Sequence, residues 1–104
     1  MWFVYIVRCA DDTLYTGIAK DVTRRIEEHN SNNVLAASYT RARRPVALVH
    51  REAVKTRSAA ARREYEIKQM TRLEKEYLIG QRGVKMESSK EQFPTAEYDE
   101  FAKT

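Results

Sequence analysis

Two β-prone segments separated by a short polar turn constrain the fold of this chain most strongly. Residues 2–8 and 13–19 consist mainly of aromatic, β-branched and other apolar residues, and aromatic and β-branched types favour strands. Residues 10–12, Ala-Asp-Asp, supply turn chemistry between them. The pattern predicts a β-hairpin that brings Tyr5 of the first strand and Tyr15 of the second into one small sheet.

A helix and a third strand are predicted after the hairpin. Asp21 can cap a helix in which Val22 and Ile26 form an apolar pair one turn apart. The Asn-rich residues 30–33 end that helix. After a loop, residues 45–50 form a strand that begins at proline.

Two further helices complete the predicted order. Thr56 or Ser58 can cap a helix over about 59–70. Residues 71–74, Thr-Arg-Leu-Glu, have the pattern of a capping box, so a new helix begins there and stops at Gly80. The order β-β-α-β-α-α predicts an α+β fold, a small three-stranded antiparallel sheet flanked by helices.

The length of the chain bounds its organisation. At 104 residues it can hold one modest core, which we expect over 1–80, followed by a polar, mobile tail over 81–104. No apolar run has the length of a membrane-spanning helix. Cys9 is the single cysteine, so no internal disulfide is possible. We expect a monomer in the cytoplasm.

Positive charge is concentrated in the middle of the chain. Between Arg41 and Arg63 eight Lys and Arg residues stand against one acid, Glu52, a net charge of +7, compared with +4 for the whole chain. Such a segment suits a polyanionic partner, because cations placed on phosphates release condensed counterions. It also suits a solvated basic surface, and charge alone leaves both interpretations open.

Glu64 lies on an apolar helical stripe. Ala60, Glu64 and Ile67 share one face of the predicted helix, and a carboxylate there needs a cation, a hydrogen bond or a metal. An ion pair with Arg63 or Lys68 is one interpretation. A ligand for Mg²⁺ is the other, because Mg²⁺ often takes one or two protein carboxylates and completes its shell with water and phosphate.

Other polar side chains also have two interpretations. Arg25 can form a helix salt bridge or stabilise a phosphoryl oxygen, and His29, one turn later, can be a surface residue or a proton-transfer group. Tyr5 and Tyr15 can be core aromatic residues whose hydroxyl groups are hydrogen-bonded. Their hydroxyl groups can also act as a base or orient water. Gly17 leaves room for a backbone to come close.

Taken together, these residues resemble the GIY-YIG nuclease family in order and spacing. Phe3-Val4-Tyr5 corresponds to the first signature triplet and Tyr15-Thr16-Gly17 to the second. Arg25, within 17–29, falls on the arginine of the family, and Glu64 falls on its metal-binding glutamate. Residues 39–46 are similar to those of small stand-alone bacterial members. The resemblance covers residues 2–80.

The resemblance implies hydrolysis of phosphodiester bonds with one divalent metal, Mg²⁺ or Mn²⁺, held by Glu64. Tyr5 would be the base, Tyr15 would orient water or phosphate, Arg25 would stabilise developing charge, and His29 would join the proton transfer. We expect the hydroxyl groups of Tyr5 and Tyr15 to line one concave, solvent-reached face with Arg25 and Glu64. The residues expected to bind nucleic acid are Gly17, Lys20, Arg24, Arg41, Arg43, Arg44 and Lys68.

The sequence departs from the family pattern at several points. Phe3 stands where the first triplet has glycine, and Thr16 where the second has isoleucine. Residues 32–38, Asn-Asn-Val-Leu-Ala-Ala-Ser, replace a loop rich in glycine and lysine, and no asparagine occurs after Asn33. The leading hypothesis is a metal-dependent, structure-selective endonuclease acting on DNA, in repair or processing. The alternatives are a non-catalytic nucleic-acid-binding module and an interaction protein whose tyrosines are core.

Overall fold

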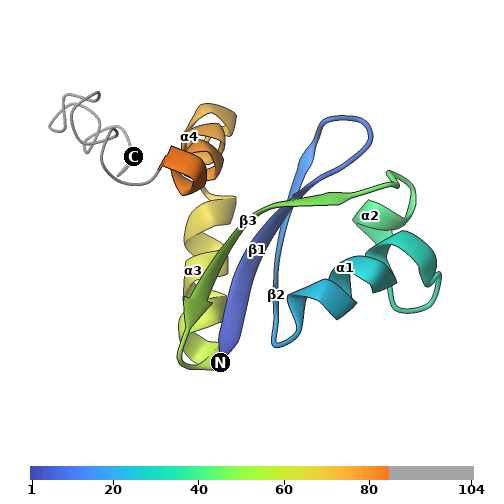
Figure 1. The fold of residues 1–104 in the computed structure, drawn as a ribbon, viewed down its shortest axis with the longest axis horizontal. Coiled ribbons are helices and arrows are strands. Elements are labelled where there is room, and N and C mark those ends of the chain that lie inside the picture. The colour runs from blue at the N-terminus through green and yellow to red at the C-terminus, as the bar shows by residue number, and fades with distance from the viewer. Residues whose placement is uncertain (85–104) are drawn as a thin grey trace, which may run out of the picture. The chain divides into compact units, whose positions relative to one another are not determined.

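The computed structural model describes residues 1–84 and confirms the α+β fold. Three strands form one antiparallel sheet in the order β2-β1-β3, with the hairpin predicted from the sequence as its first two strands (Figure 1). The elements are β1 (Trp2–Arg8), β2 (Leu14–Ala19), α1 (Val22–Ser31), α2 (Ser38–Arg41), β3 (Ala47–Val54), α3 (Arg57–Lys68) and α4 (Arg72–Val84). Residues Met1–Lys68 form one compact unit, and α4 belongs to a second that begins at Gln69.

Strand register places both signature tyrosines on one face of the sheet. Tyr5 lies opposite Gly17, and Tyr15 lies opposite Val7. Because side chains alternate along a strand, these four positions share a face, with the two tyrosines diagonal to each other. The pairing of β1 with β3 shifts register by one residue between Ile6 and Val7, so Tyr5 lies opposite Arg51 whereas Val7 lies opposite Leu48.

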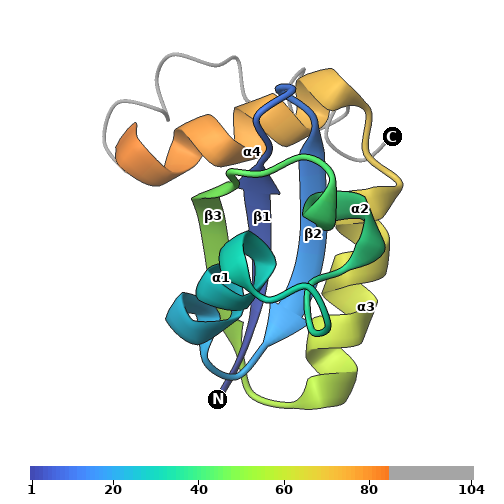
Figure 2. The ribbon, with the colours of Figure 1, turned by 90° about the vertical axis from the view of Figure 1, so that its right-hand side faces the viewer.

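The sheet separates two layers of helices within the first unit. In Figures 1 and 2, α1 and α2 lie on one side of the sheet and α3 lies on the other. The α1 side carries a core of buried residues, which are Tyr5, Val7, Cys9, Val22 and Val46, with Phe3, Tyr15, Ala19, Ile26, Tyr39 and Leu48 packed against it. On the opposite side α3 buries Ala60 and Ile67 completely, as the predicted apolar stripe requires.

Helix caps follow the sequence closely. The Asp21 carboxylate accepts a bond from the Arg24 backbone N–H at 3.0 Å, and Thr56 caps α3 by accepting from the Ala59 N–H at 3.0 Å. Thr71 and Glu74 exchange the two bonds of a capping box, at 2.8 and 3.1 Å. Each cap satisfies backbone donors that the first helical turn leaves without partners.

Four elements differ from the sequence prediction. The short helix α2 lies in a segment predicted as loop, and β3 runs to Val54, four residues beyond the predicted end at His50. Helix α3 occupies Arg57–Lys68 rather than 59–70, and α4 continues through Gly80 to Val84. The prediction of a mobile tail falls, from residue 85 onward, outside the described residues. Within residues 1–84, no helix has both the length and the apolar character needed to cross a bilayer.

Candidate active site

A buried chain of polar side chains connects the sheet to α1 and α2. Tyr5 Oη lies 2.9 Å from His29 Nε2, and His29 Nδ1 lies 2.7 Å from Thr40 Oγ1. Thr40 Oγ1 in turn donates to the carbonyl oxygen of Ala37 at 3.1 Å. His29 and Thr40 are 0% exposed and Tyr5 is 1% exposed. The expectation that both tyrosine hydroxyls line a solvent-reached face is therefore wrong for Tyr5, which lies at the closed floor of the site.

Gly17 makes room for the Tyr5 phenol. A Cβ atom at position 17 would lie 2.5 Å from Tyr5 Oη and 2.8 Å from Tyr5 Cζ, well inside van der Waals contact. No described glycine has a positive φ angle, so the requirement at this position is space and not backbone freedom. The structure thus gives Gly17 a packing function beside Tyr5, while its predicted contact with nucleic acid stays a prediction.

Aromatic rings extend the site from His29 toward the surface. The half-buried Tyr15 ring meets His29 edge-on, with 5.5 Å between ring centroids, and stacks on Tyr39 at 5.8 Å. The guanidinium carbon of Arg43 lies 3.9 Å from the centre of the Tyr39 ring. Tyr15 therefore borders the Tyr5–His29 pair on the side that reaches solvent.

Burial sets the protonation states of the Tyr5–His29 pair. Burial, with a smaller contribution from Tyr15, raises the pKa of Tyr5 to about 12, although Arg25 opposes the rise. Burial, together with the positive charge of Arg25, lowers the pKa of His29 to about 4. Near neutral pH Tyr5 therefore keeps its proton and His29 is a neutral imidazole, which has one ring nitrogen free to accept a hydrogen bond.

Arg25 is held beside Tyr5 by two acceptors. Its Nη1 donates to Glu28 Oε1 at 3.0 Å and to the carbonyl oxygen of Leu35 at 2.7 Å. Burial disfavours its charge, but the bond to Glu28 and the proximity of Tyr5 raise the pKa of Arg25. The side chain is half-buried, so its positive charge lies near Tyr5 and still meets solvent.

Glu64 supports both interpretations given to it. Its carboxylate forms an ion pair with Lys68 at 3.1 Å, the pair expected one turn along the helix, while Arg63 bonds elsewhere. Its negative charge is also among the influences that raise the pKa of Tyr5, so Glu64 belongs electrostatically to the tyrosine site. The side chain is 24% exposed and that of Lys68 is 49% exposed, so the carboxylate is open to an ion brought from solution.

The predicted nucleic-acid-binding cations fall into two groups. Arg41, Arg43 and Arg44 form hydrogen bonds within the protein. Arg41 donates to the carbonyl oxygen of Asn33, and Arg43 donates to Asp11 and to the carbonyl oxygen of Tyr39. Arg44 donates to the carbonyl oxygen of His29 and to the side chain of Asn33. Lys20 and Arg24 are exposed; Lys20 lies over the Trp2 ring at 5.6 Å and Arg24 pairs loosely with Glu28 at 3.4 Å. Their contacts with nucleic acid stay predictions.

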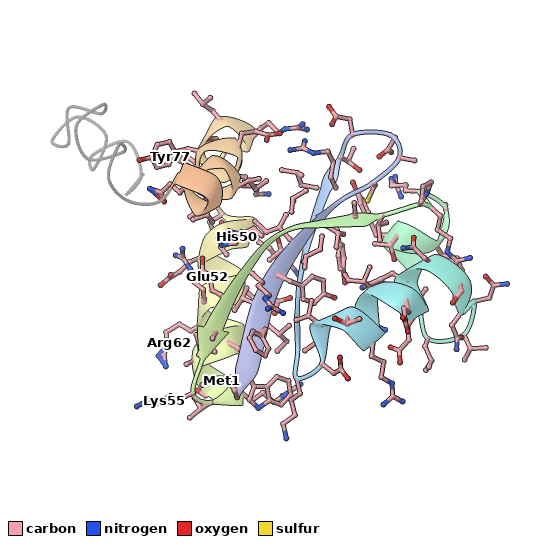
Figure 3. All side chains as sticks on the ribbon, viewed as in Figure 1. Met1, His50, Glu52, Lys55, Arg62 and Tyr77 are labelled. Carbon is pink, nitrogen blue, oxygen red and sulfur yellow. The ribbon has the colours of Figure 1, made fainter. Side chains whose placement is uncertain are left out.

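A second polar cluster lies on the opposite face of the sheet. Figure 3 shows His50 and Glu52 on the side of β3 that faces α3, away from α1. Arg63 donates to both Glu52 oxygens at 2.8 and 3.0 Å, and His50 Nε2 lies 2.8 Å from Glu52. Burial alone would raise the pKa of Glu52, but the bonds from His50 and Arg63 outweigh it and lower the pKa to about 2. This cluster joins β3 to α3 and takes no part in the tyrosine site.

Sequence reasoning missed two residues of the site, Thr40 and Tyr39. Both lie on α2, and a helix of four residues gives no periodic signal that could reveal it. The one hint is chemical: a buried histidine needs a partner for each ring nitrogen, and a hydroxyl such as that of Thr40 can supply one.

Comparison with known proteins agrees with this geometry. Residues 1–77 match the model of the GIY-YIG catalytic domain. The UPF0213 protein of Desulfotalea psychrophila is 58% identical over 78 residues, which is 75% of this chain and 70% of that protein. The UPF0213 protein of Staphylococcus aureus strain Mu3 is 55% identical over 80 residues, 77% of this chain and 95% of that protein.

A solved structure shares the fold. The solution NMR structure of the UPF0213 protein from Bacillus halodurans has a TM-score of 0.51 and 39% sequence identity, covering 88% of this chain and 97% of that chain. With the match of a nuclease domain over most of the chain, and with Tyr5, Tyr15 and Arg25 gathered at one site, the sequence resemblance is confirmed: this chain belongs to the GIY-YIG family.

Proposed function

We propose that this protein is a metal-dependent endonuclease that hydrolyses phosphodiester bonds of DNA and selects DNA by structure rather than by base sequence, in repair or processing. One observation carries the proposal: the Tyr5 hydroxyl is joined to His29 Nε2 at 2.9 Å, with Arg25 and Tyr15 beside them. Membership of a nuclease family supports phosphodiester hydrolysis. Structure selectivity agrees with recognition through exposed cations, because phosphate contacts carry no base information.

The Tyr5–His29 pair would remove the proton of the attacking water. As the water oxygen bonds to phosphorus, Tyr5 Oη accepts the water proton and passes its own proton to His29 Nε2. This relay avoids a free phenolate, which a pKa of about 12 limits to about one molecule in 10⁵ near neutral pH. The bond from phosphorus to the leaving oxygen breaks, and the leaving oxygen takes a proton from solvent.

Arg25 would respond to the arriving phosphate. In the free protein its guanidinium rests on Glu28 and on the carbonyl of Leu35. A phosphate is a stronger, charged acceptor for the same planar fork, so we expect Arg25 to turn from the carbonyl toward the phosphate. That movement would uncover the nearly closed Tyr5 hydroxyl and place positive charge where the transition state becomes more negative.

Glu64 would hold Mg²⁺ or Mn²⁺. Among residues 1–84 no group of three or more His, Cys, Asp or Glu side chains could hold a metal ion, so Glu64 would bind the ion as a lone protein carboxylate. Such a site fits Mg²⁺, which keeps several waters and takes other ligands from substrate phosphates. When bound, the ion stabilises negative charge on the phosphate and on the leaving oxygen.

A cleavage assay tests the proposal. Branched, flapped, nicked and single-stranded DNA, with RNA counterparts, are incubated with the protein and Mg²⁺ or Mn²⁺. We expect Glu64→Gln to abolish cleavage and to leave binding intact or tighter, since the amide keeps the shape but loses the charge that attracts the cation. Tyr5→Phe should slow cleavage by roughly 10²–10⁴-fold.

Glu66→Gln is the matched control, because Glu66 lies on the same helix and pairs with Arg63 outside the tyrosine site. It should cleave like the wild type. Equal cleavage by wild type and Glu64→Gln would mean that the activity belongs to a contaminant.

A non-catalytic nucleic-acid-binding module is the second candidate, and the Glu64–Lys68 ion pair at 3.1 Å is the observation that favours it. A carboxylate neutralised by its own helix attracts a metal less strongly. Binding of nucleic acid without cleavage of any of these substrates would select this candidate.

A further inference from the structure

One direction of the buried hydrogen-bond chain follows from the bond at its far end. Thr40 has one hydroxyl proton, and a bond from Oγ1 to the carbonyl oxygen of Ala37, 3.1 Å away, uses that proton. A carbonyl oxygen has no proton to give, so Thr40 must be the donor in that bond. Toward His29 Nδ1, 2.7 Å from the same oxygen, Thr40 can then only accept. With the hydroxyl proton used in this way, His29 carries its proton on Nδ1.

The protonation state of the other ring nitrogen of His29, Nε2, follows from this assignment. A neutral imidazole has one N–H and one lone pair, so a proton on Nδ1 leaves Nε2 as an acceptor. Nε2 is the atom that faces Tyr5 Oη at 2.9 Å, and the phenol donates to it. With the opposite tautomer, the Nε2 proton would point at Tyr5 and the phenol would have no acceptor on the ring.

From this chain we infer that Thr40 is a positioning residue of the active site: by accepting a hydrogen bond from the Nδ1–H of His29, it keeps the Nε2 lone pair directed at the Tyr5 hydroxyl. The inference rests on the proposed function for its consequence, since that lone pair receives the Tyr5 proton when Tyr5 takes one from water. After the transfer Nδ1 still donates to Thr40, so the new imidazolium keeps both hydrogen bonds.

Burial makes the assignment firm. His29 and Thr40 are both 0% exposed, so bulk water does not compete for Nδ1, and a hydrogen bond is stronger in such a low-dielectric setting. The low pKa of His29, about 4, means that the neutral ring, for which the choice of tautomer matters, is the form present during catalysis. Thr40 touches neither substrate nor metal in this account and acts through His29 alone.

The histidine tautomers can be read directly by NMR. The chain has two histidines, and they should differ. His50 Nε2 faces a carboxylate oxygen of Glu52 at 2.8 Å, and a carboxylate only accepts, so His50 should carry its proton on Nε2. Ring ¹⁵N shifts of the full chain near neutral pH should thus show a protonated Nδ1 and an unprotonated Nε2 for His29, and a protonated Nε2 for His50, with His50→Gln assigning the signals. His29 protonated on Nε2 in the wild type would overturn the inference.

Two variants separate positioning from packing. Thr40→Val keeps the side-chain shape but removes the acceptor, and Thr40→Ser keeps the hydroxyl. We expect Thr40→Val to move the His29 proton to Nε2 and to lower kcat at least about tenfold with KM unchanged, while Thr40→Ser keeps the tautomer and most of kcat. A Thr40→Val protein that is folded and retains the Nδ1 proton, or one with the inverted tautomer and full kcat, would refute the positioning function.

The tautomer measurement needs no substrate. If the wild type cleaves nothing, the proposed nuclease function fails, but the ¹⁵N shifts still decide the bond between His29 and Thr40. If Thr40→Val does not fold, the wild-type and Thr40→Ser spectra still test the assignment, because both must show His29 protonated on Nδ1.

Discussion

Replacing Gly17 with alanine should disrupt the active site through space alone. The new Cβ atom would lie 2.5 Å from Tyr5 Oη and 2.8 Å from Tyr5 Cζ, so the phenol must retreat by roughly 1 Å to reach ordinary contact. The Tyr5–His29 bond measures 2.9 Å, and such a shift would stretch or bend it past useful geometry. Overpacking costs about 1–3 kcal/mol and the lost hydrogen bond about 1 kcal/mol more.

Denaturant unfolding of the full chain would measure this loss. We expect Gly17→Ala to lower the free energy of unfolding by about 2–4 kcal/mol, with a fall in Tm of at least about 8 °C. Gly80→Ala is the matched control: Gly80 lies inside a helix with no described atom within 4 Å of an added Cβ, so it should stabilise the protein by up to about 1 kcal/mol.

A double-mutant cycle locates the clash. Tyr5→Phe removes the nearest atom, Oη, and leaves Cζ at 2.8 Å, so Gly17→Ala should cost about 1 kcal/mol less in that background. The result that refutes this reasoning is a Gly17→Ala protein with wild-type stability and wild-type His29 NMR signals. It would mean that β2, an edge strand of the sheet, moves aside in place of the phenol.

Three further predictions concern charge. Binding of DNA should weaken about 40-fold between about 50 and 200 mM salt if three phosphates are contacted, with little dependence on base sequence; affinity that does not change with salt would exclude the basic segment as the binding surface. The free energy of unfolding should fall as pH drops from 6.5 toward about 4. In this range His29 is protonated in the unfolded chain but stays neutral in the folded protein, because burial lowers its pKa from 6.5 to about 4. The loss should approach about 3 kcal/mol, and His29→Gln should remove it; an unchanged pH profile in that variant would assign the effect elsewhere. Glu52→Gln should lower stability by about 1–3 kcal/mol, since Arg63 loses its charged partner, without slowing cleavage; Glu66→Gln, which removes a 54% exposed partner of Arg63, should change stability by less than about 1 kcal/mol.

Local signals were sufficient for most of the fold. The hairpin follows from residue types and a polar turn, and the Asp21 cap and the Thr71–Glu74 capping box follow from patterns within four residues. The end of β3 could not be predicted in this way. Its last four residues include Glu52, which points toward α3. Burying a carboxylate on this face is unfavourable without a cation, and the cation, Arg63, lies on a different element and forms an ion pair with Glu52.

For the site, too, local spacing predicts some features, whereas others depend on the tertiary fold. Arg25 and His29 share a helix face by their spacing, and strand alternation brings Tyr5, Tyr15 and Gly17 to one face of the hairpin. The burial of Tyr5 and the contact of His29 with Thr40 depend on how α1 and α2 cover the sheet, and pairs 24 and 11 residues apart leave no local pattern. Glu64 could be predicted only in part. Its place on an apolar helix face predicts that the carboxylate needs a partner, but the sequence does not show whether that partner is Lys68 or a metal ion.

Arg25 and Thr40 each bond to the backbone of the loop between α1 and α2 and not to its side chains. Arg25 bonds to the carbonyl of Leu35 and Thr40 to the carbonyl of Ala37, and a peptide bond presents the same carbonyl whichever side chain it carries. The outward side chains of this loop, Val34 at 86% exposed and Leu35 at 50%, are therefore free to vary among relatives without disturbing either contact. The backbone contacts of Arg25 and Thr40 and the exposed surface of the loop can thus change separately within one short segment, so Val34 and Leu35 can be replaced while both contacts are preserved.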